Sequence, residues 1–239
     1  MDDRGQPRAR TAPQERRVRE MFDDVVERYD LVNGLLSLGL DRRWRRAAVR
    51  AAAAARGDAV LDLGCGTGEL SRALADGSSA VVGLDVSAGM LRAAAAHPAT
   101  HVRLVQGSAF ALPFRDGAFD AIASAFVLRN LSDLPGAFAE LARVAAPGGR
   151  LAIVDITEPS ASVLRRPFDL YFGTAAPALG AVFGKREAYR YLARSLAQLP
   201  SPQEVVTLLE EAGFRPAAAR PLTGGMVTLF TAARPDAAA

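Results

Sequence analysis

Three glycines stand at alternate positions, Gly64, Gly66 and Gly68, directly after an apolar segment. Because glycine has no Cβ, a backbone with this pattern can turn tightly and approach a ligand closely. A second apolar segment, residues 80–84, is followed by Asp85, about twenty residues after the glycines, the separation at which a carboxylate binds the two hydroxyls of a ribose. The residue types and their spacing therefore predict a site for a ligand that contains adenosine.

The acidic residues around the glycines indicate which adenosine ligand fits. A dinucleotide-binding loop has its third glycine three residues after the second, where the chain approaches a pyrophosphate, and this sequence has Glu69 there. Glu69 and Asp62 flank the loop with negative charge, which repels phosphates but attracts an amino group and a sulfonium. S-adenosylmethionine carries both groups, so we predict that it is the ligand. For the glycine loop taken alone, a simple turn is the alternative.

The composition fits one α/β domain with additions, because the chain has 239 residues, of which 50% are hydrophobic and 23% charged. The 29 Lys and Arg residues include only one lysine, Lys185, so we attribute the arginine content to coding bias rather than to nucleic-acid binding. The single cysteine, Cys65, excludes an internal disulfide and favours a cytoplasmic setting. We expect neither a membrane span nor a signal peptide.

Hydrophobic periodicity predicts that strands and helices alternate from residue 59 onward, which is typical of a parallel sheet covered on both faces. We expect strands over residues 59–63, 80–85, 102–106, 119–124, 150–155, 214–220 and 225–233. We expect helices over residues 67–75, 87–96, 133–145 and 203–213. The segment Pro147-Gly148-Gly149 is interpreted as the punctuation between a helix and a strand.

The carboxyl ends of parallel strands meet at one edge of a sheet, and ligands bind there where the strand order reverses. Five segments that are distant in the sequence are expected at this edge. They are the glycine loop 64–68, Asp85, and residues 106–109, 125–130 and 155–158.

Helical additions are expected before the first strand. Residues 1–14 combine prolines with scattered charges and are expected to be disordered. Apolar residues at helical spacing predict helices over residues 15–27 and 41–55. Between them lies loop 28–37, which carries Tyr29 and either closes over a bound cofactor or caps the neighbouring helices.

A second addition, residues 162–200, is richer in aromatic side chains than the rest of the chain. These are Phe168, Tyr171, Phe172, Phe183, Tyr189 and Tyr191. They are explained equally by helices that pack on the sheet and by a lid over an apolar substrate.

Several motifs resemble those of the ubiquinone/menaquinone biosynthesis C-methyltransferases, which are class I S-adenosylmethionine-dependent enzymes. The segments Tyr29-Asp30-x-x-Asn33 and Leu128-Arg129-Asn130 are the most specific to this family, whereas the glycine loop and Pro147-Gly148-Gly149 occur in class I methyltransferases generally. The resemblance covers residues 20–233.

The resemblance implies an α/β fold with a Rossmann-like, seven-stranded, mostly parallel sheet, helices on both faces and an N-terminal helical addition. A single methyltransferase domain is then expected over residues 15–233, with a helical cap over 15–56, a substrate lid over 160–200 and a disordered tail over 234–239. Together with the loop pattern, it predicts the residues that bind S-adenosylmethionine. They are Tyr29, Asp62, Gly64, Gly66, Thr67, Gly68, Asp85, Val86, Met90, Ser108, Ala109 and Ala125. The chain departs from the family pattern at Asp41, Ala125 and 155–157.

Carbon methylation of a quinol needs no metal, because an ionised ring hydroxyl makes the adjacent carbon nucleophilic enough to attack the sulfonium methyl. Arg129 is assigned to stabilise that phenolate and Asn130 to orient a ring oxygen. The alternative for Arg129 is a structural arginine that ties loops together. His97 and His101 are expected on the surface, so no base is identified.

The predicted reaction is the conversion of demethylmenaquinol to menaquinol, with a polyprenyl quinol as substrate, peripheral contact with the membrane, and a homodimer left open. One alternative is a methyltransferase for another small aromatic or natural-product acceptor. Another is an accessory protein that binds S-adenosylmethionine without turnover. Nucleic-acid methylation is disfavoured, because residues 125–128 lack the Asn/Asp-Pro-Pro-aromatic pattern that holds a flipped base.

Overall fold

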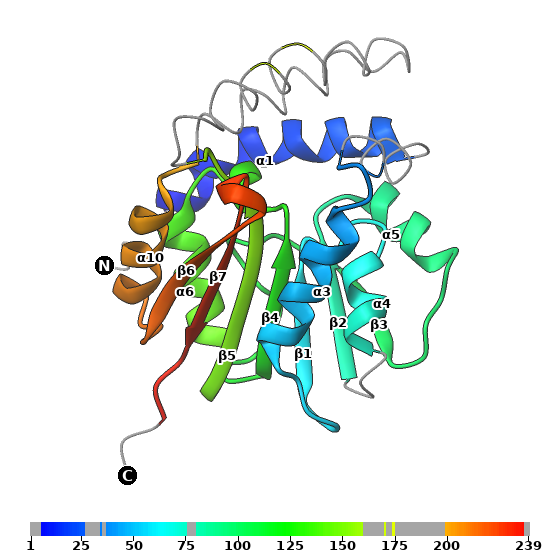
Figure 1. The fold of residues 1–239 in the computed structure, drawn as a ribbon. Helices are drawn as coiled ribbons and strands as arrows, with labels where there is room; N and C mark the ends of the chain where they lie inside the picture. The colour runs from blue at the N-terminus through cyan, green and yellow to red at the C-terminus, as the bar shows by residue number, and fades with distance from the viewer. Residues whose placement is uncertain are drawn as a thin grey trace.

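Seven strands form one sheet in the computed structural model of the chain, which describes residues 6–26, 34, 37–75, 80–159, 170, 174 and 199–236 (Figure 1). The strands lie in the order β3-β2-β1-β4-β5-β7-β6. They are β1 (Ala59–Leu63), β2 (Ala80–Asp85), β3 (Val102–Gln106), β4 (Phe119–Ala125), β5 (Ala145–Ile156), β6 (Ala217–Leu222) and β7 (Val227–Ala233). Strand β7 runs antiparallel to β5 and β6, and the other neighbouring pairs are parallel. The predicted Rossmann-like sheet is confirmed.

Helices cover both faces of this sheet. They are α3 (Asp41–Ala52), α4 (Glu69–Ala75), α5 (Ala88–Ala95), α6 (Leu134–Val144) and α10 (Pro202–Glu211). Helix α1 (Gln6–Val25) lies along the upper edge of the sheet in Figure 1, and a short 3-10 helix η3 (Leu128–Asn130) follows β4. Buried residues of α3 and α4 form one apolar cluster with the strands, and buried residues of α6 and α10 belong to a second cluster. In Figure 1 the first pair of helices lies in front of the sheet and α6 behind it.

The central strand β1 shows why both faces are buried. Successive side chains of a strand point to opposite faces, so Leu61 and Leu63 join the cluster that contains α6, whereas Val60 joins the cluster that contains α3. Fully burying a leucine contributes about 1.5–3 kcal/mol. Asp62 shares the face of Val60 and is fully buried, which is an unusual place for a carboxylate.

The strand order places the predicted site. Strand β1 has β2 on one side and β4 on the other. The chain therefore adds β2 and β3 on one side of β1 and then returns to add β4 on the other side. In such sheets the crevice for a ligand opens at the carboxyl ends of the strands, where the order reverses. The loops after β1 and β4 therefore face each other across that crevice.

Strand β5 begins earlier than the sequence suggested. It starts at Ala145, which pairs with Phe119, and it runs through residues 147–149 instead of beginning after them. Gly148 has φ +70°, and its N–H donates to the carbonyl of Arg234 at 3.0 Å. The Pro-Gly-Gly segment is thus an irregularity inside a strand, so the prediction of punctuation between helix and strand was wrong.

The first helix also starts early. Helix α1 begins at Gln6, within residues 1–14, which were expected to be disordered. Disorder was expected partly because this segment contains prolines, which lack a backbone N–H donor and commonly end a helix. Pro13 instead lies within the helix with its side chain exposed. At the other end, Arg234 of the expected tail donates its N–H to the carbonyl of Gly149 at 2.8 Å.

Two predicted features fall outside the described residues. Tyr29, with its motif partners Asp30 and Asn33, is one of them, and the aromatic residues assigned to the lid are the other. Within the predicted lid only residues 170, 174 and 199–200 are described. Among the described helices, none combines the length and the apolar character that crossing a bilayer requires.

Candidate functional site

The loop after β1 adopts the backbone conformation that its glycines predicted. Gly64, Gly66 and Gly68 have φ angles of +65°, +55° and +84°, in the left-handed region that favours glycine. A Cβ on Gly64 would also lie 2.3 Å from Cγ2 of Val127, in the loop after β4. Glycine is therefore required at Gly64 by both the backbone and the close approach of the neighbouring loop.

Asp85 ends β2 and faces the same loop. One of its oxygens, Oδ2, accepts the N–H of Gly66 at 2.9 Å, and the other accepts the N–H of Ser87 at 2.8 Å. Burial raises the pKa of this carboxyl above its usual value, and the hydrogen bonds from Ser87, Gly66 and Val86 oppose that rise. Asp85 is thus a buried acid whose orientation is fixed by the glycine loop.

Asp62 lies beneath the loop on the α4 side. Its Oδ2 accepts the hydroxyl of Ser71 at 2.5 Å, whereas its buried Oδ1 has no partner among the described residues. Burial raises the pKa of Asp62 to about 7, against the influence of Ser71 and of the positive charge on Arg45. A buried oxygen without a donor is costly unless a ligand satisfies it.

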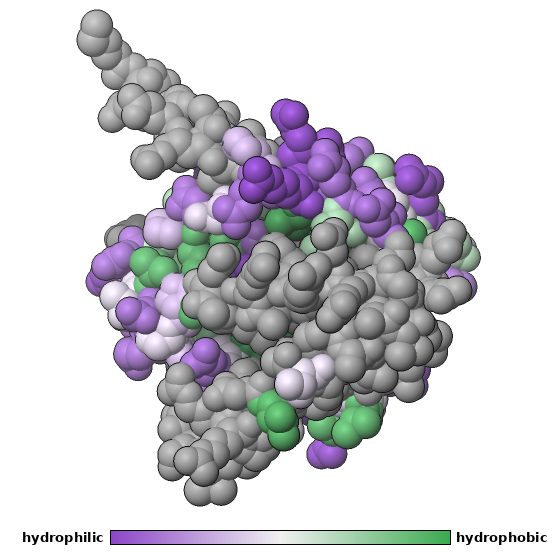
Figure 2. Space-filling view, turned by 90° about the horizontal axis from the view of Figure 1, so that it is seen from above, coloured by the Kyte–Doolittle hydropathy of each residue, from purple (hydrophilic) through white to green (hydrophobic). Residues whose placement is uncertain are grey.

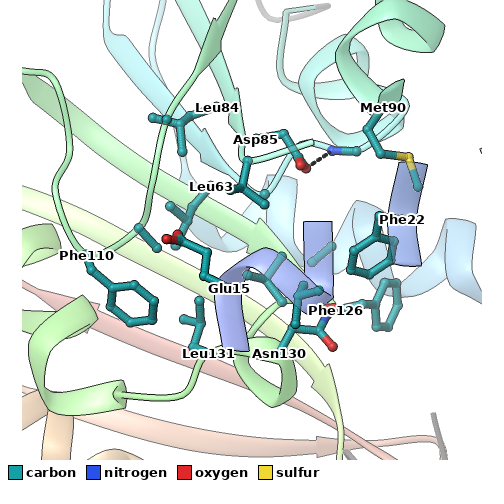
Figure 3. Close-up of a pocket in the computed structure, with 18 residues that line it drawn as sticks. Glu15, Phe22, Leu63, Leu84, Asp85, Met90, Phe110, Phe126, Asn130 and Leu131 are labelled. Atoms are coloured by element: carbon teal, nitrogen blue, oxygen red, sulfur yellow. Dashed lines mark hydrogen bonds between the residues drawn. The ribbon is translucent and has the colours of Figure 1, made fainter. Parts of the chain in front are cut away.

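A pocket opens at the carboxyl edge of the sheet between these loops (Figure 3). Eight of its lining residues were predicted to bind cofactor or substrate. They are Gly64, Gly66, Asp85, Val86, Met90, Ala109, Ala125 and Asn130. Met90 is almost fully buried, and Figure 3 shows its sulfur on the side of the pocket where Phe22 lies. The structure therefore brings together residues from four strand ends that are far apart in the sequence.

Other predicted residues support the loops from outside the pocket. Asp62, Thr67, Gly68, Ser108 and Arg129 are not among its lining residues. The carbonyl of Thr67 accepts a bond from Arg72 at 2.9 Å, and the hydroxyl of Ser108 accepts the N–H of Phe110 at 3.1 Å.

Arg129 makes a buried ion pair with Asp155 at the end of β5. Its Nη1 lies 2.6 Å from Oδ1, and the two side chains are 8% and 0% exposed. The same carboxylate accepts the N–H of Ile156 at 2.8 Å. The guanidinium thus ties η3 to β5, which favours the structural alternative for Arg129. Asn130 lines the pocket and donates from its amide nitrogen to the carbonyl of Phe126 at 3.3 Å.

Helix α1 was not expected in the pocket wall, although Glu15, Val18 and Phe22 line it. The spacing of Val18 and Phe22 was interpreted only as the apolar face of a helix, and that pattern does not distinguish a core from a pocket. Glu15 was expected only as the first residue of that helix. Phe110 and Leu131, which also line the pocket, carried no motif signal at all.

Arg45 of α3 adds a charged cluster beside the pocket. Its Nη1 lies 2.5 Å from Oδ2 of Asp41 and 3.1 Å from Oε2 of Glu69, the first residue of α4. The guanidinium carbon lies 5.2 Å from the ring centroid of Phe126, which lines the pocket and has a φ of +66°. A cation over an aromatic ring is attracted to it, so Arg45 supports Phe126 in a strained backbone conformation. His97 and His101 are exposed and do not line this pocket, as expected.

The sequence profile of the ubiE/COQ5 methyltransferase family matches residues 10–234. A demethylmenaquinone methyltransferase of Beutenbergia cavernae is 43% identical over 227 residues, which cover 95% of this chain and 94% of the relative. The ubiquinone/menaquinone biosynthesis C-methyltransferase UbiE of Geobacter sulfurreducens is 37% identical over 223 residues, covering 90% of this chain and 87% of the relative.

Two solved structures share the fold. The [4+2]-cyclase SpnF has a TM-score of 0.66 and 19% identity, with 92% of this chain and 96% of that chain covered. A SAM-dependent methyltransferase from Aquifex aeolicus has a TM-score of 0.58 and 22% identity, with 79% of this chain and 88% of that chain covered. At these identities the likeness concerns the fold alone, and one fold hosts several chemistries.

Proposed function

The chain belongs to the ubiE/COQ5 methyltransferase family, and on that premise we propose that it transfers a methyl group from S-adenosylmethionine to a ring carbon of a polyprenyl quinol, demethylmenaquinol. Relatives named demethylmenaquinone methyltransferase from several organisms support menaquinone rather than ubiquinone as the product. The single observation that carries the proposal is the pocket between the glycine loop and Asp85, with Asn130 on its wall.

The residues of the pocket fit S-adenosylmethionine. Asp85, a buried acid at the end of β2, would bind the two ribose hydroxyls. Behind the lining residues, the buried carboxyl of Asp62, whose Oδ1 has no partner among the described residues, suits a ligand whose amino group and sulfonium are cationic. Apolar Leu84, Ala109 and Phe110 also line the pocket, and a flat adenine ring is expected to pack against such side chains.

When bound, S-adenosylmethionine supplies the methyl group, and the chain's own residues align the acceptor. The acceptor has to be the quinol, because a ring hydroxyl that loses its proton donates electron density to the adjacent carbon, whereas the oxidised ring is electrophilic. We assign Asn130 to orient a ring oxygen. Arg129, paired with Asp155 outside the pocket lining, holds the 3-10 helix η3 that carries Asn130.

The proposal is tested by methyl incorporation followed by mass spectrometry. Short-chain demethylmenaquinol, the oxidised quinone and a phenolic natural-product acceptor are compared, with a reductant present only in the first reaction. Methylation of the quinol alone is expected. Equal activity on the oxidised quinone contradicts the mechanism, and activity on the phenolic acceptor alone identifies a different substrate class. Binding of the cofactor without turnover of any acceptor supports the accessory-protein alternative.

The substrate's polyprenyl tail partitions into lipid, so we extend the proposal to contact with the membrane surface from the carboxyl edge of the sheet. In a co-sedimentation experiment, we expect the protein to pellet with vesicles that contain demethylmenaquinol. Without these vesicles it should stay in the supernatant.

A further inference from the structure

Helix α1 lies across the carboxyl ends of the strands, along the upper edge of the sheet in Figure 1. Its residues Glu15, Val18 and Phe22 recur at intervals of three and four, so they share one face, and all three line the pocket. The opposite face is polar, with Arg16, Arg17 and Glu20 exposed. In the view from above, hydrophilic side chains gather along the upper margin of the described surface (Figure 2). A ligand in the pocket therefore contacts α1.

The last turns of α1 are attached to the N-terminus of α5 by one carboxylate. Oδ1 of Asp23 accepts the hydroxyl of Ser87 at 2.6 Å and the N–H of Gly89 at 2.8 Å. Ser87 is also the N-cap of α5, because its hydroxyl oxygen accepts the N–H of Met90 at 3.0 Å. One side chain of α1 thus completes the cap of another helix.

Gly89 allows this attachment. A Cβ at that position would lie 2.7 Å from Oδ1 of Asp23 and 3.3 Å from its Cα, so any larger residue would move the two helices apart. Desolvation alone would raise the pKa of Asp23, but its hydrogen bonds from Ser87 and Gly89 and the nearby charges of Arg92 and Arg19 lower it below the usual value. Asp23 is therefore an anion when it makes these bonds at neutral pH.

The attachment point coincides with the turn that carries the ribose-binding acid. The N–H of Ser87 donates to Asp85 at 2.8 Å, while its hydroxyl donates to Asp23. Val86 and Met90, on either side of Ser87, line the pocket. The position of α1 and the position of Asp85 are thus coupled through a single residue.

We propose that Asp23 is a positioning residue for the cofactor: by binding the turn at residues 85–90 it holds α1 over the pocket, so that α1 closes on the bound ligand. The inference rests on the proposed function only for the identity of that ligand. Ligand binding and the docking of α1 are reciprocal. If the ligand contacts α1 only when α1 is docked, docking raises the affinity for the ligand, and the ligand favours docking by the same factor.

The test uses the full chain and S-adenosylhomocysteine, the product form of the cofactor, as the probe. Affinity is measured by calorimetry and dissociation by stopped flow for Asp23→Ala and Asp23→Asn. The matched control is Glu20→Gln, an exposed carboxylate on the same helix that does not line the pocket. We expect Asp23→Ala to weaken binding about tenfold or more through faster dissociation, since it removes two charge-assisted hydrogen bonds. Asp23→Asn should weaken it less, and the control should not change it.

Limited tryptic cleavage after Arg16, Arg17 and Arg19 reports on α1 itself. The probe should protect these sites in the unaltered chain, and Asp23→Ala should abolish that protection without lowering the unfolding temperature of the sheet. Gly89→Ala is the second variant, because its Cβ displaces α1 while every side chain of the pocket remains; it should reproduce both effects.

Unchanged affinity and unchanged protection in Asp23→Ala and Gly89→Ala overturn the inference and leave the proposed function intact. Failure of the unaltered chain to bind S-adenosylhomocysteine overturns the proposed function instead. The two failures are therefore distinguishable.

Discussion

The guanidinium of Arg129 and the carboxylate of Asp155 lie 2.6 Å apart in the interior of the protein, although 26 residues separate them. The pair joins the 3-10 helix after β4 to the last residues of β5, at the edge where the pocket opens. Arg129 also has a buried Nε without a partner in the described part of the chain. An arginine held in this way ties the 3-10 helix to the end of β5 and so contributes to the structure.

Replacing either member of this pair should destabilise the fold, because the remaining charge is buried without a partner. We expect Arg129→Ala and Asp155→Ala each to lower the free energy of unfolding by about 3–5 kcal/mol. The double variant should cost clearly less than the sum of the two, as is usual for residues in contact. Urea denaturation of the three variants measures these energies. Additive losses would mean that the two charges act independently.

Asp85→Ala should weaken the binding of S-adenosylmethionine by about 2 kcal/mol or more, because it removes a charge-assisted bond and leaves ribose hydroxyls unpaired. Calorimetry gives the affinity directly. Glu211→Ala, at the exposed end of α10, is the control and should leave the affinity unchanged. Equal affinities of the Asp85 and Glu211 variants would remove Asp85 from the cofactor site.

Asp62 makes stability and binding depend on pH in opposite directions. Its pKa is raised by burial to about 7, so the stability that its neutral form contributes is fully present below about pH 4, the unfolded value, and is lost as pH rises through about 7. A cationic ligand favours the ionised form, so binding at pH 6 should release up to about one proton. Calorimetry in two buffers with different ionisation heats counts that proton.

The matched variant Asp62→Asn should abolish the proton release and reduce the loss of stability between pH 4 and pH 7, to which Asp85, whose pKa burial also raises, contributes. A release that persists in Asp62→Asn would point to another titrating group at the site.

The sequence predicted the core strands well because parallel strands buried on both faces are continuous apolar segments. Strand β1 was predicted with its observed limits, Ala59–Leu63. The early start of β5 was missed because it depends on the pairing of Ala145 with Phe119, a tertiary contact that no local pattern reports.

The candidate site was predictable where the backbone itself forms the pocket. Glycine at alternate positions and an acid at the end of a strand are local signals, and they located the pocket. Asp155 as the partner of Arg129 carried no such signal, since the pairing arises only when β4 and β5 lie side by side. The contribution of α1 to the pocket was missed for a related reason. An amphipathic pattern shows that a helix buries one face, but it does not show which part of the protein that face packs against.

Gly64→Ala should impair both folding and cofactor binding. Backbone strain and a steric clash both contribute, and a comparison with Gly57 separates these two causes. Both Gly64 and Gly57 have positive φ angles, +65° and +96°, so alanine at either position costs about 1–2 kcal/mol of backbone strain. Only at Gly64 does the new Cβ also meet a side chain, Val127, at 2.3 Å, whereas nothing lies within 4 Å at Gly57.

We therefore expect Gly57→Ala to lower the unfolding temperature modestly and to leave the affinity for S-adenosylmethionine unchanged. Gly64→Ala should lower the unfolding temperature further and weaken binding at least tenfold, because the clash drives apart the two loops that form the crevice. Shortening the neighbour relieves that clash, so the double variant Gly64→Ala with Val127→Ala should regain part of the lost affinity while the backbone strain remains. Thermal unfolding and calorimetry are measured on the unaltered chain, the two single glycine variants and the double variant. If Val127→Ala restores nothing, the loss arises from backbone strain at Gly64 and the close approach of the two loops has no role in holding the cofactor.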